Sequence, residues 1–393
     1  MRLDKLMDPV QRDVDSRSVS ELCDLATRGL VEMLDRERQI FCHVYRRTES
    51  GMVREGHSPR YTMMTLLGLQ RYERAGQRSP VAITPVLDAL LEDTNWITSA
   101  GDLGLLLWTC AELTPDRLPQ IYQQVQAREA LARFPDGQQG STMEVSWYLT
   151  GLATCCLAGY SDLPGLAEQA EAARHILNRN CGDSGIYGHR GRSRSLAGYV
   201  RGRIGSFADQ AYPTIAFARL SQANDDGEAR KMALRTAKKM CELQGPLGEW
   251  YWQYDSVSGR VVGRYPVYSV HQHGMAPMML FAAGEATGCD FSEAIHKGLA
   301  WISGNNELRR DFVEPSLGLV WRCIYLEPMK AYTDAALRLS GLRSGAAGAG
   351  LKIRYECRPY ELGWLLFAFA RKPQLPGSAK KLLHTSLGLQ SQA

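Results

Sequence analysis

The sequence predicts an all-α fold, an (α/α) barrel of six or possibly seven helical hairpins, on three observations. Segments with apolar residues at helical spacing follow one another along most of the chain. They alternate between amphipathic, charged segments and segments that are apolar on nearly every side, and a helix that is apolar all round must be buried all round. A polar or anchor residue begins each apolar segment at intervals of 42 to 65 residues, which indicates a repeated hairpin. An open solenoid of the same hairpins is the alternative.

The first hairpin illustrates the reasoning for all of them. Segment 20–37 repeats leucines such as Leu22, Leu25 and Leu30 on one face, as an outer helix does. Segment 60–76 is typical of a more buried helix and ends at a glycine, as an inner helix does. The remaining outer helices are expected, in chain order, at 85–93, 115–134, 163–180, 226–244, 291–304 and 331–341, and their inner partners at 101–113, 141–160, 206–223, 266–288, 316–326 and 359–371.

Few other segments carry a signal. A short strand hairpin is expected within 257–268, with its turn at Ser258-Gly259. Residues 341–350 have the composition of a flexible loop. We expect one barrel domain over 1–372 and a loosely ordered tail over 373–393.

Composition excludes several classes of protein. With 45% hydrophobic and 22% charged residues, the chain of 393 residues is not a disordered one. A net charge of +4 is too small to indicate nucleic-acid binding. No apolar run approaches the 18 residues of a membrane span, and the start lacks the apolar core of a secretion signal, so a cytoplasmic location is expected.

No cofactor or metal is expected. The sequence contains no phosphate-binding, dinucleotide, nucleophile-elbow or zinc-protease motif. Its ten cysteines form no CxxC pair, and most sit in apolar segments, as small buried side chains do in a reducing compartment.

The densest cluster of chemically versatile residues lies at 243–279, where aromatic and polar side chains alternate. A core does not need that mixture, because every buried polar group demands a partner, whereas a ligand pocket combines flat apolar surfaces with a few directional polar groups. We therefore expect a substrate site here, joined by residues at the starts of other inner helices. The expected substrate-binding residues are Arg60, Tyr61, Trp147, Gln210, Trp250, Trp252, Tyr254, Tyr268, Gln272 and His273.

Acidic residues near the starts of inner helices are the candidates for acid–base chemistry. Asp102, Glu144 and Asp209 should converge on one mouth of a barrel, and Asp255 and His271 lie in the aromatic cluster. Glycoside cleavage needs two carboxyl groups, one protonated and one ionised. The alternative reading is structural, because Glu144 and Asp209 each stand three residues after a serine, as in a helix cap.

An arginine-rich segment at 188–203 joins the fourth hairpin. Arg192 and Arg194 lie in it among glycine and serine, and planar guanidinium groups suit carboxylates or phosphates. We expect these two residues to bind an anionic substrate at the barrel mouth; a solvated loop is the alternative.

Two family resemblances meet in the aromatic cluster. Gly248-Glu-Trp250, Asp255 and Tyr268-Ser269, with the helix start Phe207-Ala-Asp209-Gln210, resemble the six-hairpin glycosidases of the unsaturated uronyl hydrolase group, where such residues line the sugar pocket. Gln244-Gly-Pro-Leu-Gly-Glu-Trp250 resembles one copy of the Gln–Trp repeat of squalene-type terpene cyclases, whose Asp-x-Asp-Asp motif is absent here.

The sequence thus predicts a carbohydrate-active enzyme, a glycoside hydrolase or lyase, that acts on an anionic oligosaccharide. A terpene-cyclase-like barrel, in which aromatic rings stabilise carbocations, is the second reading. A non-catalytic helical binding scaffold is the third.

Overall fold

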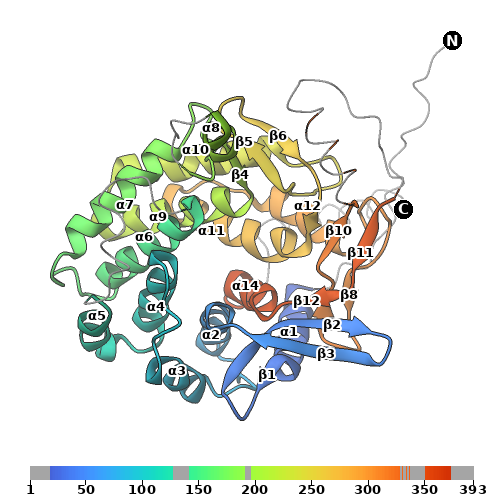
Figure 1. The fold of residues 1–393 in the computed structure, drawn as a ribbon, viewed down its shortest axis with the longest axis horizontal. Coiled ribbons are helices and arrows are strands. Elements are labelled where there is room, and N and C mark those ends of the chain that lie inside the picture. The colour runs from blue at the N-terminus through green and yellow to red at the C-terminus, as the bar shows by residue number, and fades with distance from the viewer. Residues whose placement is uncertain are drawn as a thin grey trace, which may run out of the picture.

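The computed structural model describes residues 18–126, 141–190, 196–327, 330, 333, 336 and 350–372. Six helices in these residues form a closed inner ring, because each packs against the next and the last packs against the first (Figure 1). In ring order they are α2 (Pro59–Arg74), α4 (Ala100–Leu113), α6 (Thr142–Leu157), α9 (Ala208–Asn224), α11 (Ala276–Thr287) and α14 (Pro359–Phe369).

The amphipathic helices form the outer layer. Each packs its apolar face on one inner helix, which leaves the charged face in water. In the order of the inner helices above, they are α3 (Ile83–Glu92), α5 (Leu118–Gln126), α7 (Leu166–Asn180), α10 (Gly227–Leu243), α12 (Ser292–Ile302) and α1 (Val19–Met33). The predicted (α/α) barrel is confirmed, with six hairpins in the described residues.

Serine caps explain the periodic polar residues. Ser58, Ser99 and Ser141 stand just before α2, α4 and α6, and the Oγ of each accepts a hydrogen bond from the backbone N–H three residues on, at 3.2–3.3 Å. Ser206 Oγ accepts the N–H of Asp209 in the same way at the start of α9. The polar residues that repeat along the sequence therefore mark helix caps at the N-terminal ends of the inner helices.

The predicted inner helix at 316–326 is wrong. These residues form strands β9 (Leu319–Val320) and β10 (Cys323–Tyr325), because Gly318 turns the chain with φ = +69° and β-branched and aromatic residues follow. The inner helix that follows the sixth predicted outer helix, α12, in the chain is therefore α14, while α12 itself packs on α11 and the π-helical turn. The expected seventh outer helix at 331–341, the end of the third outer helix beyond 126 and the tail 373–393 lie wholly or largely outside the described residues.

Small sheets cover the barrel end that carries the helix starts. Strands β2 (Ile40–Thr48) and β3 (Gly51–His57), which the sequence reading missed, form a hairpin beside α1 and α2 (Figure 1). The predicted strand hairpin is confirmed as β5 (Gln253–Asp255) and β6 (Arg260–Gly263), with Gly259 in the turn. The other short elements are β1 (Leu34–Asp35), β4 (Ile204–Ser206), β7 (Val267–Tyr268), β8 (Val313–Glu314), β11 (Lys352–Arg354), β12 (Glu356–Cys357), α8 (Leu196–Arg203), a 3₁₀ turn at Pro115–Arg117 and a π-helical turn at His271–Met275.

These sheets bring distant segments to the barrel end. In one sheet β2 pairs with β1, β3 and β12. This pairing joins residues 34–57 to the segment just before α14. The order β11–β10–β7 ties the segment before the π-helical turn to the strands around 323 and 353. None of the helices in the described part of the chain is long and apolar enough to cross a bilayer.

Candidate functional site

A cavity of about 410 Å³ opens at the N-terminal ends of the inner helices. Its wall is assembled from the starts of α2, α6, α9 and α14, from the π-helical turn before α11, and from strands and loops of the covering sheets. It is lined by His43, Ser58, Arg60, Tyr61, Met64, Met143, Trp147, Ala208, Tyr212, Trp252, Tyr268, His271, Met275, Arg322, Arg358 and Tyr360. Six residues expected at the site from sequence are among them: Arg60, Tyr61, Trp147, Trp252, Tyr268 and His271.

Aromatic rings supply flat apolar surface in this cavity. The ring centroids of Trp252 and Tyr268 lie 5.1 Å apart, and both rings lie within 6.1 Å of the His271 ring. Trp147 packs edge-on against Tyr212 at 5.1 Å and lies under the Arg60 guanidinium at 5.2 Å. Such surfaces hold the apolar faces of ring-shaped ligands while neighbouring polar groups fix their orientation.

Arg60 is anchored from behind by the start of α4. Its Nε and Nη2 both donate to Asp102 Oδ1, at 2.9 and 2.8 Å, and Nη2 lies 3.7 Å from Glu144 Oε1. The Asp102 side chain is buried and also accepts the backbone N–H of Thr98. Asp102 and Glu144 therefore stand behind Arg60 and do not line the cavity.

Two further arginines reach the cavity from the segments around β10 and β12. Arg322 donates from Nη1 to Glu361 Oε1 at 2.5 Å, and its Nε lies 3.2 Å from Glu356 Oε1. Burial opposes the charge of Arg322, but the Glu361 carboxylate outweighs it and raises the pKa of the guanidinium. Arg358 donates from Nη1 to Tyr61 Oη at 2.7 Å, and its Nη2 lies 3.9 Å from Glu356. Neither arginine was predicted.

His271 is buried and uncharged. Burial lowers its pKa to about 3, so the ring is neutral at neutral pH. Its Nδ1 lies 3.4 Å from the backbone oxygen of Trp250, and because a carbonyl can only accept, Nδ1 carries the proton. The lone pair of His271 is thereby assigned to Nε2, which has no hydrogen-bond partner among the described residues. Burial and the charges of the cavity arginines likewise lower the pKa of His43.

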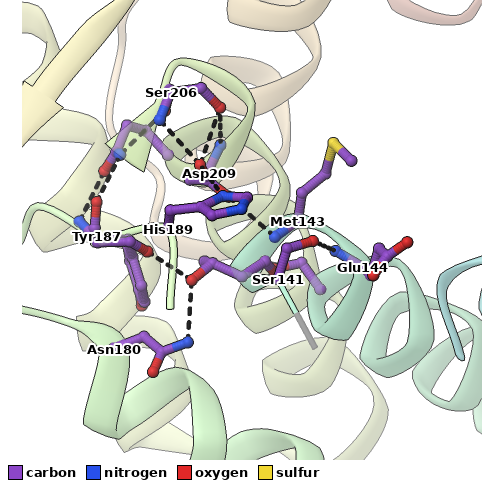
Figure 2. Close-up of polar contacts among 12 residues, drawn as sticks. Ser141, Met143, Glu144, Asn180, Tyr187, His189, Ser206 and Asp209 are labelled. Carbon is purple, nitrogen blue, oxygen red and sulfur yellow. Dashed lines mark hydrogen bonds and ion pairs between the residues drawn. The ribbon is translucent and has the colours of Figure 1, made fainter. Parts of the chain in front are cut away.

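Asp209 belongs to a capping network, shown in Figure 2, and is not among the residues that line the cavity. Its Oδ1 accepts the backbone N–H of Met143, and its Oδ2 accepts the N–H of Ser206 at 2.8 Å. The same Oδ2 lies 3.2 Å from Nδ1 of His189. With 1% of its surface exposed, Asp209 joins the starts of α6 and α9, contrary to the expectation that its carboxylate faces the cavity.

Asp255 also differs from its expected position. It is buried in the β5–β6 hairpin, where Nε and Nη2 of Arg203 donate to its two oxygens, the Nε bond at 2.7 Å. It further accepts the N–H of Val257 and the hydroxyl of Ser258. The carboxylate thus organises the turn and does not line the cavity, because its oxygens are occupied by the residues that shape the hairpin.

Several residues expected to bind substrate belong to the core instead. Gln210 exchanges two hydrogen bonds with the backbone of Tyr187, and Gln272 Oε1 accepts the N–H of Trp250. Five of these residues are buried and absent from the cavity lining: Gln210, Trp250, Tyr254, Gln272 and His273. Arg192 and Arg194 lie outside the described residues.

Sequence reasoning missed part of the lining, namely His43, Ser58, Met64, Met143, Ala208, Tyr212, Met275, Arg322, Arg358 and Tyr360. Arg358-Pro359 could have been found, because it precedes an apolar inner helix as Ser58-Pro59 does. Nothing in the sequence pattern marks His43 or Arg322, which reach the cavity only through pairing of distant strands.

Comparison with known proteins supports the fold. No family model and no curated protein matches the sequence. Among solved structures, the chain is similar to an unsaturated glucuronyl hydrolase specific for heparin (12% identity, 90% of this chain and 96% of that chain, TM-score 0.57). It is similar to cellobiose 2-epimerase from Bacillus thermoamylovorans (11%, 90% and 98%, 0.58). It is also similar to a glycosyl hydrolase of family 88 from Bacteroides vulgatus (12%, 91% and 99%, 0.54). The predicted resemblance to unsaturated uronyl hydrolases is thereby confirmed at the level of the fold.

Proposed function

We propose that this chain is a carbohydrate-active enzyme that holds a sugar ring in the barrel cavity and transfers a proton with His271. The observation that carries this proposal is the neutral His271 ring, with its Nδ1 on a backbone carbonyl and its Nε2 lone pair left for a ligand. The rings of Trp252 and Tyr268 beside it provide the platform on which a sugar stacks. The names of the structural neighbours, two glycoside hydrolases and a sugar epimerase, support the same class of substrate.

His271 is suited to the role of general base. A general base must be deprotonated at the working pH, be oriented by a hydrogen bond, and have a pKa near that pH when it takes the proton. Burial supplies the first condition and the Trp250 carbonyl supplies the second. Because the ring has a pKa of about 3 in the empty cavity, the third condition depends on negative charge that develops on the substrate beside it. The proton acceptor is Nε2, and the guanidinium groups of Arg60 and Arg322 are the donors that hold a developing negative charge on a substrate oxygen.

The lining favours elimination or epimerisation over hydrolysis. Hydrolysis of a glycoside by the usual route needs two carboxyl groups across the scissile bond. Among the described lining residues there is no aspartate or glutamate. A single oriented base with guanidinium donors instead fits removal of a proton from carbon. This argues against the predicted hydrolysis. Because the C–H beside the carbonyl of an open-chain sugar is acidic, proton removal at that carbon, as in an epimerisation, is the step that the lining supports. The predicted anionic glycan rested on Arg192 and Arg194, which lie outside the described residues.

The two other readings are less well supported. A terpene pocket tolerates few polar groups, whereas this lining carries three guanidinium groups and two histidines, which argues against a terpene-cyclase-like reaction. A binding scaffold would need no oriented base, and its sugar affinity would survive removal of that base.

The test is a comparison of His271→Asn with the native chain. Asparagine can still donate to the Trp250 carbonyl but offers no basic nitrogen. We expect turnover on a panel of glycans to fall by about 10²–10⁴-fold while sugar binding changes little, because only the proton transfer is removed. His175→Asn, on the exposed face of α7, is the matched control and should leave both unchanged. Turnover that survives His271→Asn refutes the role of His271. A chain that binds sugars but turns over none is a scaffold.

A further inference from the structure

The charges around the cavity bear on which sugars it accepts. The lining holds three guanidinium groups, on Arg60, Arg322 and Arg358, and taken alone they suggest a site for an acidic sugar. Each of them, however, lies within 4 Å of a carboxylate behind it. Whether the cavity attracts an anion therefore depends on the net charge of two layers: the guanidinium groups of the lining and the carboxylates behind them.

The carboxylate layer carries at least as much charge as the guanidinium layer. Asp102 and Glu144 face Arg60 at 2.8 and 3.7 Å. Glu361 faces Arg322 at 2.5 Å, while Glu356 lies 3.2 Å from Arg322 and 3.9 Å from Arg358. Four carboxyl groups thus oppose three guanidinium groups among the described residues. Burial raises the pKa of Glu361 against the opposing effect of the two arginines; with that group protonated the balance is zero, and with it ionised the balance is negative.

The histidines add no positive charge. Burial lowers the pKa of both His43 and His271, that of His271 to about 3, so at neutral pH both rings are neutral. Burial likewise raises the pKa of the lining tyrosines Tyr212, Tyr268 and Tyr360, which therefore remain protonated. The described lining residues and the carboxylates that contact them therefore leave no net positive charge to attract an anion.

The hydrogen-bonding groups point to the same chemistry. Arg322 uses Nη1 on Glu361 and Nε near Glu356, and its guanidinium lies over the Tyr268 ring at 4.9 Å, so Nη2 is the nitrogen that these two carboxylates leave as a donor. His271 Nε2 is an acceptor and needs a donor from the ligand. A carboxylate can only accept, and its charge is repelled by a lone pair. A hydroxyl group both donates and accepts, so a polyol satisfies the guanidinium and the imidazole together.

We infer that the cavity selects a neutral sugar over the corresponding sugar acid, and that its three arginines serve as neutralised hydrogen-bond donors for hydroxyl groups. This inference rests on the proposed function, because it concerns the ligand of the same cavity. It replaces the anionic glycan predicted from the sequence with a ligand that carries hydroxyl groups and no charge.

Matched pairs of sugars test it. Direct binding is measured for methyl glucoside, galactoside and mannoside, for each corresponding uronate, and for each uronate methyl ester, at low and at physiological salt. We expect one neutral glycoside to bind at least about tenfold more tightly than its uronate, a difference of about 1.4 kcal/mol. The methyl ester should recover most of that loss, because it restores neutrality while keeping the added bulk.

Variants of the carboxylate layer test the cause. Glu356→Gln and Glu144→Gln each remove one negative charge behind an arginine. Each should reduce, at least several-fold, the ratio of the affinity for the neutral sugar to the affinity for its uronate. Glu55→Gln is the matched control, because Glu55 pairs at 2.5 Å with Arg46 on the exposed β2–β3 hairpin and not with a lining residue. It should leave the preference unchanged.

The outcomes separate this inference from the proposed function. A uronate that binds more tightly than its neutral partner overturns the inference and leaves a carbohydrate-active enzyme in place. A preference for the neutral sugar that neither carboxylate variant changes also overturns the charge argument. A folded chain that binds no member of the panel refutes the proposed function, and the inference falls with it.

Discussion

Replacing Gly363 by alanine tests how closely the ring of inner helices is packed. A Cβ at this position of α14 would lie 2.7 Å from Thr65 Cα and 2.9 Å from Met64 O, both backbone atoms of α2. Ordinary contact begins near 3.4 Å, so α14 and α2 would have to separate by about 0.7 Å. Backbone atoms cannot rotate away as the end of a side chain can, so the strain falls on the packing of the ring itself.

The expected magnitude follows from two opposing effects. Overpacking of a well-packed core costs about 1–3 kcal/mol, and a clash with backbone atoms belongs at the upper end, about 2–3 kcal/mol. Alanine gains up to about 1 kcal/mol over glycine from its helix propensity. The net expectation for Gly363→Ala is a loss of about 1–2 kcal/mol in the free energy of unfolding. Because Arg358 and Tyr360 at the start of α14 line the cavity, ligand binding should weaken as well.

The assay is denaturant unfolding of Gly363→Ala beside Gly227→Ala, together with sugar affinity. Gly227 begins the outer helix α10, and a Cβ there would meet no atom within 4 Å. Its replacement should leave stability unchanged within about 0.5 kcal/mol or raise it slightly. A Gly363→Ala protein as stable as the native chain would refute the close approach of α14 and α2 on which the description of the ring depends.

Three further predictions concern the buried polar residues. Arg203→Ala should destabilise the fold by about 3–5 kcal/mol at pH 7, because it leaves the buried Asp255 unpaired. Burial works against the Asp255 charge, but Arg203 and the turn outweigh it and lower the pKa of the carboxyl. Its contribution is therefore present above about pH 4 and lost as the pH falls further, and urea unfolding of both proteins at pH 7 and pH 3 checks this. His273 has a pKa lowered to about 3 by burial, and neither ring nitrogen has a partner among the described residues. Stability should fall by about 1.4 kcal/mol per pH unit for this group as the pH drops from 6.5 toward 3, and His273→Phe should remove that part of the slope while the part from His271 remains. Trp250→Ala should cost about 3–5 kcal/mol by thermal or chemical unfolding, since Trp250 is fully buried; unchanged stability with lost sugar binding would return it to the site.

The architecture could be predicted because it depends on local sequence patterns, namely apolar periodicity and helix caps. Apolar periodicity separates helices that are buried on one face from helices buried on all faces, and this decides which belong inside the ring. The cap residues that repeat along the chain mark where each inner helix begins. Arg60, Trp147 and His271 were found by this rule, because the start of a buried helix is a place where a side chain can reach the open end of the barrel.

The same local patterns could not separate a cap from a catalytic group. Asp209 and Asp255 looked like acids of an active site, but their oxygens are occupied by the Met143 N–H and by Arg203, partners that only folding brings near. The charge balance of the cavity was equally hidden, because Glu361 meets Arg322 across 39 residues of chain. Short-range sequence determined the helices and their buried faces, since those depend on neighbours within a few residues. The tertiary structure alone decided which polar groups face the cavity, since that depends on contacts between segments far apart in the chain.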